Sequence, residues 1–239
     1  MNVRSNLSKQ IKKVFAKSLF KKFSLLAAVL VLSACSFEEE DNSTENLQNY
    51  RTEIHANLMK NLTFSESYDI AFVGDSITNL GDFENVFADK NCVNLGICSI
   101  TIRNLRSYLD MIVEANPKKL FLMIGVNSFL FHEGNFYEVL ADYETLIQEI
   151  KSLCPDTQIF IESVLPVAAN MADFVPNSVI KEYNKYLIKF AQKYDATFID
   201  LYSLYEVDGY LDESFTEDGL HLKEFAYQAW YDEVAKYMD

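Results

Sequence analysis

The sequence contains little histidine, cysteine or glycine, and it has no long apolar run. Three histidines, four cysteines and seven glycines occur in 239 residues. An apolar run at residues 23–34 is twelve residues long, which is too short for a helix to span a bilayer. His132 and Glu133 are not followed by a second histidine at metal-binding spacing, and no glycine-rich phosphate loop occurs. These absences disfavour a metalloenzyme and a nucleotide-binding module, so we expect no metal and no other cofactor.

The first 34 residues have the composition of a targeting segment. Residues 1–22 carry seven lysines and arginines and no acidic residue, and the apolar run follows directly. This order is typical of a signal peptide. The run ends in the letters LSAC, and small residues before Cys35 resemble the lipobox of bacterial lipoproteins, in which the cysteine is lipidated. We therefore expect residues 1–34 to be removed and Cys35 to carry a lipid anchor; the alternative is an ordinary signal peptide with a chance cysteine.

The rest of the chain is acidic. The full chain has a formal net charge of −14, and removal of the basic leader makes the remainder more negative. Such a surface repels nucleic acid and anionic lipid headgroups, so we expect no nucleic-acid partner. Residues 35–46 are polar and acidic and predict a flexible tether. A similar acidic patch follows the lipidated cysteine in surface-exported lipoproteins of Bacteroidetes-like bacteria, which implies a surface-exposed protein of the outer membrane.

Three cysteines follow residue 35, and an odd number cannot form a complete disulfide framework. Cys92 lies in an apolar, strand-like run, and Cys154 lies at a predicted helix end before Pro155. We expect both to be buried free thiols. A disulfide between Cys92 and Cys98 is a second interpretation that nothing in the sequence supports.

Short apolar runs alternate with segments of helical spacing from residue 68 onward. The runs are rich in isoleucine, valine and phenylalanine, as in strands covered on both faces; they lie at 68–74, 91–97, 119–125, 158–166 and 196–202. Helices are predicted at 46–62, 101–115, 135–153, 178–194 and 222–238. The alternation predicts one α/β domain over residues 47–239, with five parallel strands in a doubly wound sheet.

Ligands of such sheets bind beyond the carboxyl ends of the strands. The first run is followed there by Gly74-Asp75-Ser76, the second ends in Asn94-Leu95-Gly96, and the third is followed by Val126-Asn127-Ser128. We interpret Asp75 as a hydrogen-bonding loop residue. A fourth fragment, with the letters EDGLHL, precedes the last predicted helix and contains Asp218 and His221.

A serine hydroxyl needs a neutral imidazole to accept its proton before it becomes a useful nucleophile. His55 lies in a helix before the sheet begins, and His132 has the setting of a turn or surface residue. His221 follows an acid at three residues' distance, and Asp218 could orient its ring. Incidental charges in a loop that leads into a helix explain the same pair equally well.

Taken together and in this order, the four fragments resemble the sequence blocks of the SGNH (GDSL-type) hydrolases. The resemblance covers nearly all of residues 66–239 and implies a flavodoxin-like three-layer α/β/α fold. It also implies that Ser76 is the nucleophile, His221 the general base and acid, and Asp218 its orienting partner. The backbone N–H groups of Ser76 and Gly96 and the side-chain amide of Asn127 would form the oxyanion hole.

Two positions depart from the pattern of that family. Ser128 stands where an aspartate usually follows the asparagine, and Ser99 stands where many relatives carry a further glycine. We therefore expect the residues that support Asn127, and the flexibility of the Gly96 loop, to differ from those of the family. Arg103 and Arg106 share a helix face beside that loop; they predict a solvated face, with contact to an acidic substituent as the alternative.

The expected activity is hydrolysis of short acyl esters by a lipid-anchored serine esterase, with O-acetyl groups on carbohydrate as the expected substrate. A lysophospholipase or thioesterase of the same family is an alternative with the same chemistry. From a different class, a surface glycan-binding lipoprotein that has lost catalysis is supported only by Ser128. The oligomeric state is not indicated by the sequence.

Overall fold

The computed structural model describes residues 49, 52–53, 55–56 and 67–239. The predicted signal peptide, the lipidation site at Cys35 and the acidic tether lie outside the described residues. The described positions of the first predicted helix, 49, 52–53 and 55–56, are helical. Within the described part of the chain, no helix combines the length and apolar character needed to cross a bilayer.

A five-stranded parallel sheet forms the centre of the domain, as predicted. In chain order, its strands are β1 (Ile70–Gly74), β2 (Cys92–Asn94), β3 (Lys119–Met123), β4 (Gln158–Glu162) and β5 (Thr197–Ile199). Their spatial order is β2-β1-β3-β4-β5, and every neighbouring pair is parallel. This is the order of flavodoxin-like sheets, in which ligands bind where the order reverses, between β1 and β3.

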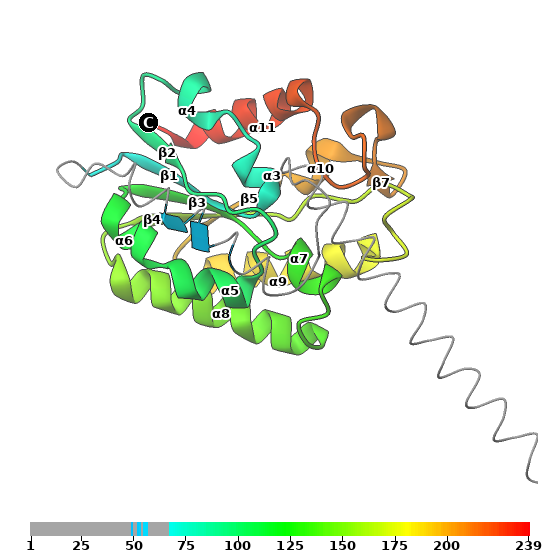
Figure 1. Cartoon of the computed structure of the whole chain (residues 1–239), viewed down its shortest axis with the longest axis horizontal. Helices are drawn as coiled ribbons and strands as arrows, with labels where there is room; N and C mark the ends of the chain where they lie inside the picture. Colours follow the sequence, from blue (N-terminus) through cyan, green and yellow to red (C-terminus); the bar gives the residue numbers. More distant parts are fainter. Residues whose placement is uncertain (1–48, 50–51, 54, 57–66) are drawn as a thin grey trace, which may run out of the picture.

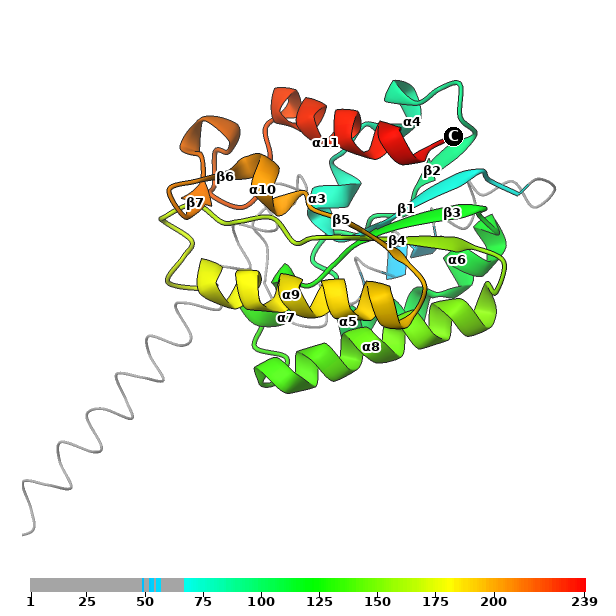
Figure 2. The same ribbon diagram turned by 180° about the vertical axis from the view of Figure 1, so that it is seen from behind.

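Helices cover both faces of the sheet and make a three-layer fold (Figure 1). One face is covered by α4 (Phe83–Val86) and α11 (Tyr227–Val234), and α11 is flanked by the 3₁₀ turns η3 (Glu224–Ala226) and η4 (Ala235–Tyr237). The turned view in Figure 2 shows the opposite layer. Its helices are α5 (Ile102–Leu105), α6 (Asp110–Ala115), α8 (Phe136–Leu153) and α9 (Asn177–Lys193).

Short elements at the carboxyl ends of the strands complete the domain. They are α3 (Ser76–Asn79), α7 (Val126–Leu130), α10 (Tyr202–Tyr205), the hairpin β6 (Glu206–Val207) and β7 (Tyr210–Leu211), and the turn η2 (Glu213–Phe215). The predicted helix at 101–115 is divided into α5, a 3₁₀ turn η1 (Arg106–Tyr108) and α6. The hairpin was not predicted, although its turn, Asp208-Gly209, has positive φ at both residues and is a strong hairpin signal.

An aromatic row ties the sheet to the α11 layer. The rings of Phe72, Phe121 and Phe160 come from β1, β3 and β4 and stack with centroid separations of 5.1 and 4.5 Å. Phe83 stacks on Phe72 at 3.9 Å and meets the edge of Trp230 on α11. Stacked and edge-to-face rings bury large apolar areas in defined orientations. The row therefore sets where α11 lies above the strand ends.

Candidate active site

Ser76 lies at the junction between β1 and α3. Asp75 caps the helix, because its Oδ1 accepts a hydrogen bond of 3.0 Å from the backbone N–H of Ile77. A Cβ at Gly74 would collide with Thr78 Oγ1 and the carbonyl oxygen of Met123. Close packing, rather than positive φ, therefore requires glycine before the turn. The result is a buried serine at the first position of a one-turn helix.

The second part of the site is the loop that precedes η3. Asp218 Oδ1 accepts hydrogen bonds from the backbone N–H groups of Leu220 and His221, at 2.9 and 2.8 Å. Thr216 Oγ1 accepts from the N–H of Gly219 at 2.9 Å. The acid thus organises the backbone that presents the imidazole, and all of these contacts fall within six residues.

The structure brings Ser76, His221 and Asp218 into one chain of hydrogen bonds. Ser76 Oγ lies 2.8 Å from His221 Nε2, although the two residues are 145 positions apart. His221 Nδ1 lies 2.5 Å from Asp218 Oδ2. Because a carboxylate only accepts, Nδ1 carries the proton and Nε2 is left to accept from the serine hydroxyl. Ser76 is 1 % exposed and His221 6 % exposed, so this chain of contacts is largely shielded from water.

The pKa values of two carboxyl groups of the site are shifted in opposite directions. Burial alone would raise the pKa of Asp218, but hydrogen bonds from the side chain and backbone of His221, and the charge of that ring, lower it to about 2. Burial raises the pKa of Asp75 to about 6, against the opposing effect of its bond from Ile77. Asp218 is therefore ionised at neutral pH and can stabilise a charged imidazole.

Asn127 enters the same region from α7, directly after β3. Its Nδ2 donates to the carbonyl oxygen of Ile100 at 3.0 Å, which fixes the orientation of the amide because that carbonyl requires a donor. An amide nitrogen carries two hydrogens, and the bond to Ile100 uses one. Ser128 Oγ accepts from the N–H of Ile102 at 3.1 Å. The serine that replaces the usual aspartate thus bonds to the first residue of α5, close to the carbonyl that holds Asn127.

The backbone N–H of Gly96, which the sequence predicted to be an oxyanion donor, is already hydrogen-bonded within the protein. Its single backbone hydrogen is donated to Asn94 Oδ1 at 2.9 Å, so in this arrangement it is not available as an oxyanion donor. A Cβ at Gly96 would collide with the backbone of Asn79, and close packing against α3 accounts for this glycine. Ser99, three residues later, has a φ of +59°, in the left-handed region that glycine adopts most easily.

Asn94 is a residue whose importance the sequence did not reveal. Its Nδ2 donates to the carbonyl oxygens of Thr78 and Gly81, at 2.8 and 2.9 Å, while its Oδ1 accepts from Gly96. One side chain therefore connects the end of β2 with the far end of α3. The only signal in the sequence is its place two residues before Gly96 at a strand end.

The other histidines and the cysteines expected to be free thiols are not part of the site around Ser76. His55 Nε2 contacts Asp110 Oδ1 at 2.8 Å, and His132 is an exposed turn residue with a φ of +52°. Cys92 and Cys154 are free thiols, so a disulfide between Cys92 and Cys98 does not form. In the described part of the chain, no group of His, Cys, Asp and Glu side chains is arranged to hold a metal ion.

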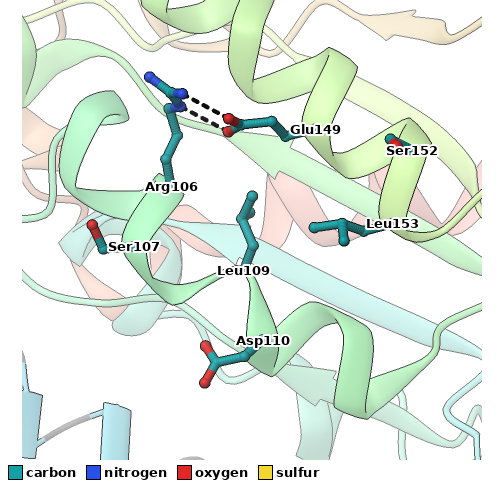
Figure 3. A pocket seen from close by; sticks show the side chains of 7 residues that line it. All are labelled: Arg106, Ser107, Leu109, Asp110, Glu149, Ser152 and Leu153. Atoms are coloured by element: carbon teal, nitrogen blue, oxygen red, sulfur yellow. Dashed lines mark hydrogen bonds and ion pairs between the residues drawn. The ribbon is translucent and has the colours of Figure 1, made fainter.

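The two arginines beside the Gly96 loop bind acidic side chains of α8. Arg103 Nη2 lies 2.7 Å from Asp142 Oδ2, and Arg106 contacts both carboxylate oxygens of Glu149 at 2.6 and 2.7 Å. Arg106 and Glu149 line a surface pocket at the C-terminal end of α8 (Figure 3). That end of α8 leads into the start of β4, so the pocket lies at the opposite edge of the sheet from Ser76.

Residues 72–229, two thirds of the chain, match the GDSL-like lipase/acylhydrolase family. The chain belongs to this family. The predicted family and class of enzyme are thereby confirmed, as the strand order confirmed the five-stranded parallel sheet. Residues 72–229 thus form a domain of a family of serine enzymes that act on carboxylic esters.

Known proteins similar to this GDSL-like hydrolase include two solved structures. One, from Streptococcus pneumonia, is named for platelet activating factor; it is 27 % identical, with a TM-score of 0.74 over 82 % of this chain and 95 % of its own. The second is a mutant form of an acetyl-xylooligosaccharide esterase from Geobacillus Stearmophilus. It is 16 % identical, with a TM-score of 0.57 over 73 % and 95 % of the two chains, and this likeness shows the fold alone.

A third relative is a longer protein. An N-acylneuraminate cytidylyltransferase of Escherichia coli is 27 % identical over 182 residues, which are 72 % of this chain but 41 % of the relative. The chain thus spans about two fifths of the length of that curated relative. The match concerns only a part of the longer protein.

Proposed function

We propose that the protein hydrolyses short acyl esters, above all O-acetyl groups on carbohydrate, through an acyl-enzyme on Ser76. The observation that carries the proposal is the hydrogen-bonded series from Ser76 Oγ through His221 to Asp218, at 2.8 and 2.5 Å. A neutral imidazole in contact with a serine hydroxyl, and oriented by an ionised carboxylate, is what activates serine as a nucleophile.

The reaction begins when Ser76 Oγ attacks the ester carbonyl carbon and its proton passes to His221 Nε2. The carbonyl oxygen becomes an oxyanion, and the imidazolium is stabilised by Asp218. His221 then returns the proton to the oxygen of the leaving alcohol as the carbon–oxygen bond breaks. Water, deprotonated by the same ring, attacks the acyl-enzyme and releases the acid and free Ser76.

Two donors support the oxyanion in this proposal. The N–H of Ser76 is the first of a helix and has no acceptor within α3, as is general for the first turn of a helix. Asn127 supplies the amide hydrogen that Ile100 does not use. Loss of one such donor typically costs about 3–4 kcal/mol in the transition state. Gly96 would contribute its N–H only if Asn94 released it.

The carbohydrate part of the proposal rests on analogy. Two of the similar proteins have names that refer to carbohydrate substrates, acetyl-xylooligosaccharide and N-acylneuraminate. The acidic chain also makes a large polyanion an unfavourable substrate. The relative named for platelet activating factor favours a second candidate, an acylhydrolase that acts on phospholipid-like esters.

The test is acetate release from a panel of acetylated oligosaccharides, with acetylated and long-chain lysophospholipids and an acyl thioester as competitors. We expect release from the oligosaccharides, labelling by a fluorophosphonate, and loss of both in Ser76→Ala. Ser107→Ala, which removes an exposed serine, is the matched control. Preference for lysophospholipid or thioester would favour the alternative hydrolases. Glycan binding without release or labelling would overturn the proposal in favour of a non-catalytic surface protein.

The proposal includes the location. We infer from the basic leader, the apolar run and the letters LSAC that Cys35 is lipidated and holds the hydrolase at the outer surface of the cell. Labelled palmitate should enter the wild-type protein but not Cys35→Ala. Protease added to intact cells should degrade the domain, and full protection would contradict surface exposure.

A further inference from the structure

Helix α3, which begins with the proposed nucleophile, is too short to hold its own position. It has four residues, and a single turn of helix is unstable unless other groups fix it. The carbonyl oxygens at its end therefore need donors from outside the helix. Thr78 O receives one from Asn94, as described above. The carbonyl next to the nucleophile, that of Ile77, receives its donor from the opposite end of the sequence.

That donor is Tyr227, the first residue of α11. Its hydroxyl donates to Ile77 O at 2.7 Å, across 150 positions of sequence. Tyr227 is 2 % exposed and Ile77 is also 2 % exposed, so water cannot replace this bond. Burial raises the pKa of the tyrosine well above its usual value, and the hydroxyl stays protonated. A buried carbonyl that loses its donor moves or remains unpaired at a cost in free energy.

The same C-terminal segment therefore contacts the nucleophile helix at two adjacent points. His221 meets Ser76 Oγ, and six residues later Tyr227 meets Ile77 O. Helix α11 is fixed to the sheet in turn, because Trp230 Nε1 donates to Glu162 Oε1, at the end of β4, at 2.7 Å. The aromatic row beneath α11 adds a second attachment through Phe83 and Trp230.

We propose that Tyr227 is a positioning residue of the active site, which sets the distance between Ser76 Oγ and His221 Nε2 by holding the Ile77 carbonyl. The inference rests on the proposed role of Ser76 as nucleophile. Tyr227 touches neither substrate nor reacting atoms. Its effect is on the placement of the serine, and a displacement of about 1 Å at a reacting group can cost about a hundredfold in rate.

Helix α11 also provides a matched control. Tyr231 lies one turn further along it, and its hydroxyl accepts a hydrogen bond of 2.7 Å from the N–H of Asp82, six residues beyond the nucleophile. Tyr231 is 7 % exposed. Tyr227→Phe and Tyr231→Phe therefore each remove one hydroxyl from the same helix face, but only the first removes a bond beside Ser76.

The experiment measures kcat and KM on p-nitrophenyl acetate, the rate of fluorophosphonate labelling, and the melting temperature. For Tyr227→Phe we expect kcat and the labelling rate to fall together, by about tenfold to a hundredfold, with KM within about twofold of wild type. Tyr231→Phe should keep kcat within about twofold of wild type, while it lowers the melting temperature about as much as Tyr227→Phe does. Tyr227→p-aminophenylalanine, which restores a donor at the same reach, should recover most of the lost kcat.

Two results would overturn the proposal. In one, Tyr227→Phe is less stable but has wild-type kcat; in the other, both phenylalanine variants lose activity in proportion to their stability. If Tyr227→Phe does not fold, the p-aminophenylalanine variant takes its place. The proposal would be overturned if that variant folded, lacked the bond to Ile77 and still had activity at or above the wild-type level.

A spectroscopic measurement separates this inference from the proposed function. The ¹⁵N chemical shift of His221 Nε2 reports its hydrogen bond with Ser76 and does not require turnover. Tyr227→Phe should move that shift toward the value in Ser76→Ala, and Tyr231→Phe should leave it unchanged. Absence of esterase activity in the wild-type protein would refute the proposed function alone. An unchanged shift in Tyr227→Phe would refute the positioning role alone.

Discussion

The loop that carries Asp218 and His221 and the turn that carries Ser76 are held by different kinds of contact. In the loop, the acid bonds to backbone groups two and three residues away, and Thr216 bonds to Gly219. In the turn, the carbonyls of α3 are bonded by Asn94 from β2 and by Tyr227 from α11. The side-chain bonds of the acid and of Thr216 are thus local, although Ala168 N–H and Asn170 Nδ2 also donate to the carbonyls of Gly219 and Asp218 from a distant segment. The side-chain bonds that brace the carbonyls of α3, in contrast, form only when distant elements have packed. Mutations should therefore affect the two regions differently.

The largest expected effect comes from breaking the local loop. Asp218→Asn should lower kcat by about three to four orders of magnitude, because an amide cannot hold the imidazole in the required tautomer. The change should also lower the melting temperature, because it removes a charged carboxylate whose pKa, despite burial, is lowered to about 2 by its bonds to His221 and the backbone. Steady-state kinetics on p-nitrophenyl acetate and a thermal melt check this.

Glu217→Gln is the control for that variant, because Glu217 is the neighbouring acid and its side chain is 83 % exposed. It should behave as wild type. If Asp218→Asn retained more than about a tenth of wild-type kcat, Asp218 would not orient the base.

The second-largest effect on kcat is expected from loss of the Asn127 side-chain amide, which is a proposed oxyanion donor. Asn127→Ala should lower kcat by about a hundredfold to a thousandfold with little change in KM, because the amide would act on charge that develops only in the transition state. Asn85→Ala, on exposed α4, should not change either constant. A rise in KM at constant kcat would show instead that Asn127 binds the ground-state substrate.

The distant bracing of the turn is tested by Asn94→Ala. The variant leaves the carbonyl of Gly81 and the N–H of Gly96 without their side-chain partner, and it removes one donor from Thr78 O, which still accepts from the N–H of Gly81 at 3.1 Å. We expect the free energy of unfolding to fall by about 1–3 kcal/mol, with a smaller loss of activity than in Asn127→Ala.

The matched control is Asn91→Ala, just before the same strand, where the amide donates to Ser67 O on the surface. Urea denaturation should show almost no change for this variant. Equal destabilisation by both substitutions would mean that Asn94 has no special role in the turn.

The smallest effect on activity is expected at the bond between Trp230 and Glu162 that attaches α11 to the sheet. The change expected there is in the pH dependence of stability. Burial raises the pKa of Glu162 to about 8, against the bond from Trp230, so the folded protein favours the protonated acid. A raised pKa in the folded state stabilises the protein below the usual value of 4.5 and loses this effect as pH rises through about 8. The unfolding free energy of wild type should therefore fall between pH 5 and 8 relative to that of Glu162→Gln.

Urea denaturation of both proteins at pH 5, 6.5 and 8 measures this difference. Asp75, whose pKa is also raised, is present in both proteins, so its contribution cancels. A constant difference between the two proteins over this range would contradict the prediction.

The same contrast explains how much of the molecule could be predicted from sequence. Strands covered on both faces appear as apolar runs, and all five were placed correctly. The end of the first strand at Gly74 was correct, but the other four ends were placed too late. The run at 91–97 forms a strand only over Cys92–Asn94, because the chain then leaves the sheet to pack against α3. Helix α8, with its capping box of Asn135 and Glu138, matches the predicted 135–153 almost to the residue. No residue marked the break between α5 and α6.

For the site, short spacing was informative and long-range contact was not. The structure brings Asp218 and His221 together at the three-residue spacing noted in the sequence, and it places Ser76 and Asn127 after β1 and β3, where the sheet order reverses. Asn94 and Tyr227 could not be recognised. An asparagine at a strand end and a tyrosine in an amphipathic helix are most often ordinary structural residues, and their partners become evident only when the chain has folded.

The bond between Trp230 and Glu162 has a practical consequence, because this is the single tryptophan of the chain. Its indole is completely buried against the sheet, so its fluorescence emission is a native optical signal for the seating of the C-terminal helix. Detachment of that helix would shift the emission to longer wavelength while the sheet was still intact. Unfolding of this one segment can thus be followed without any added label.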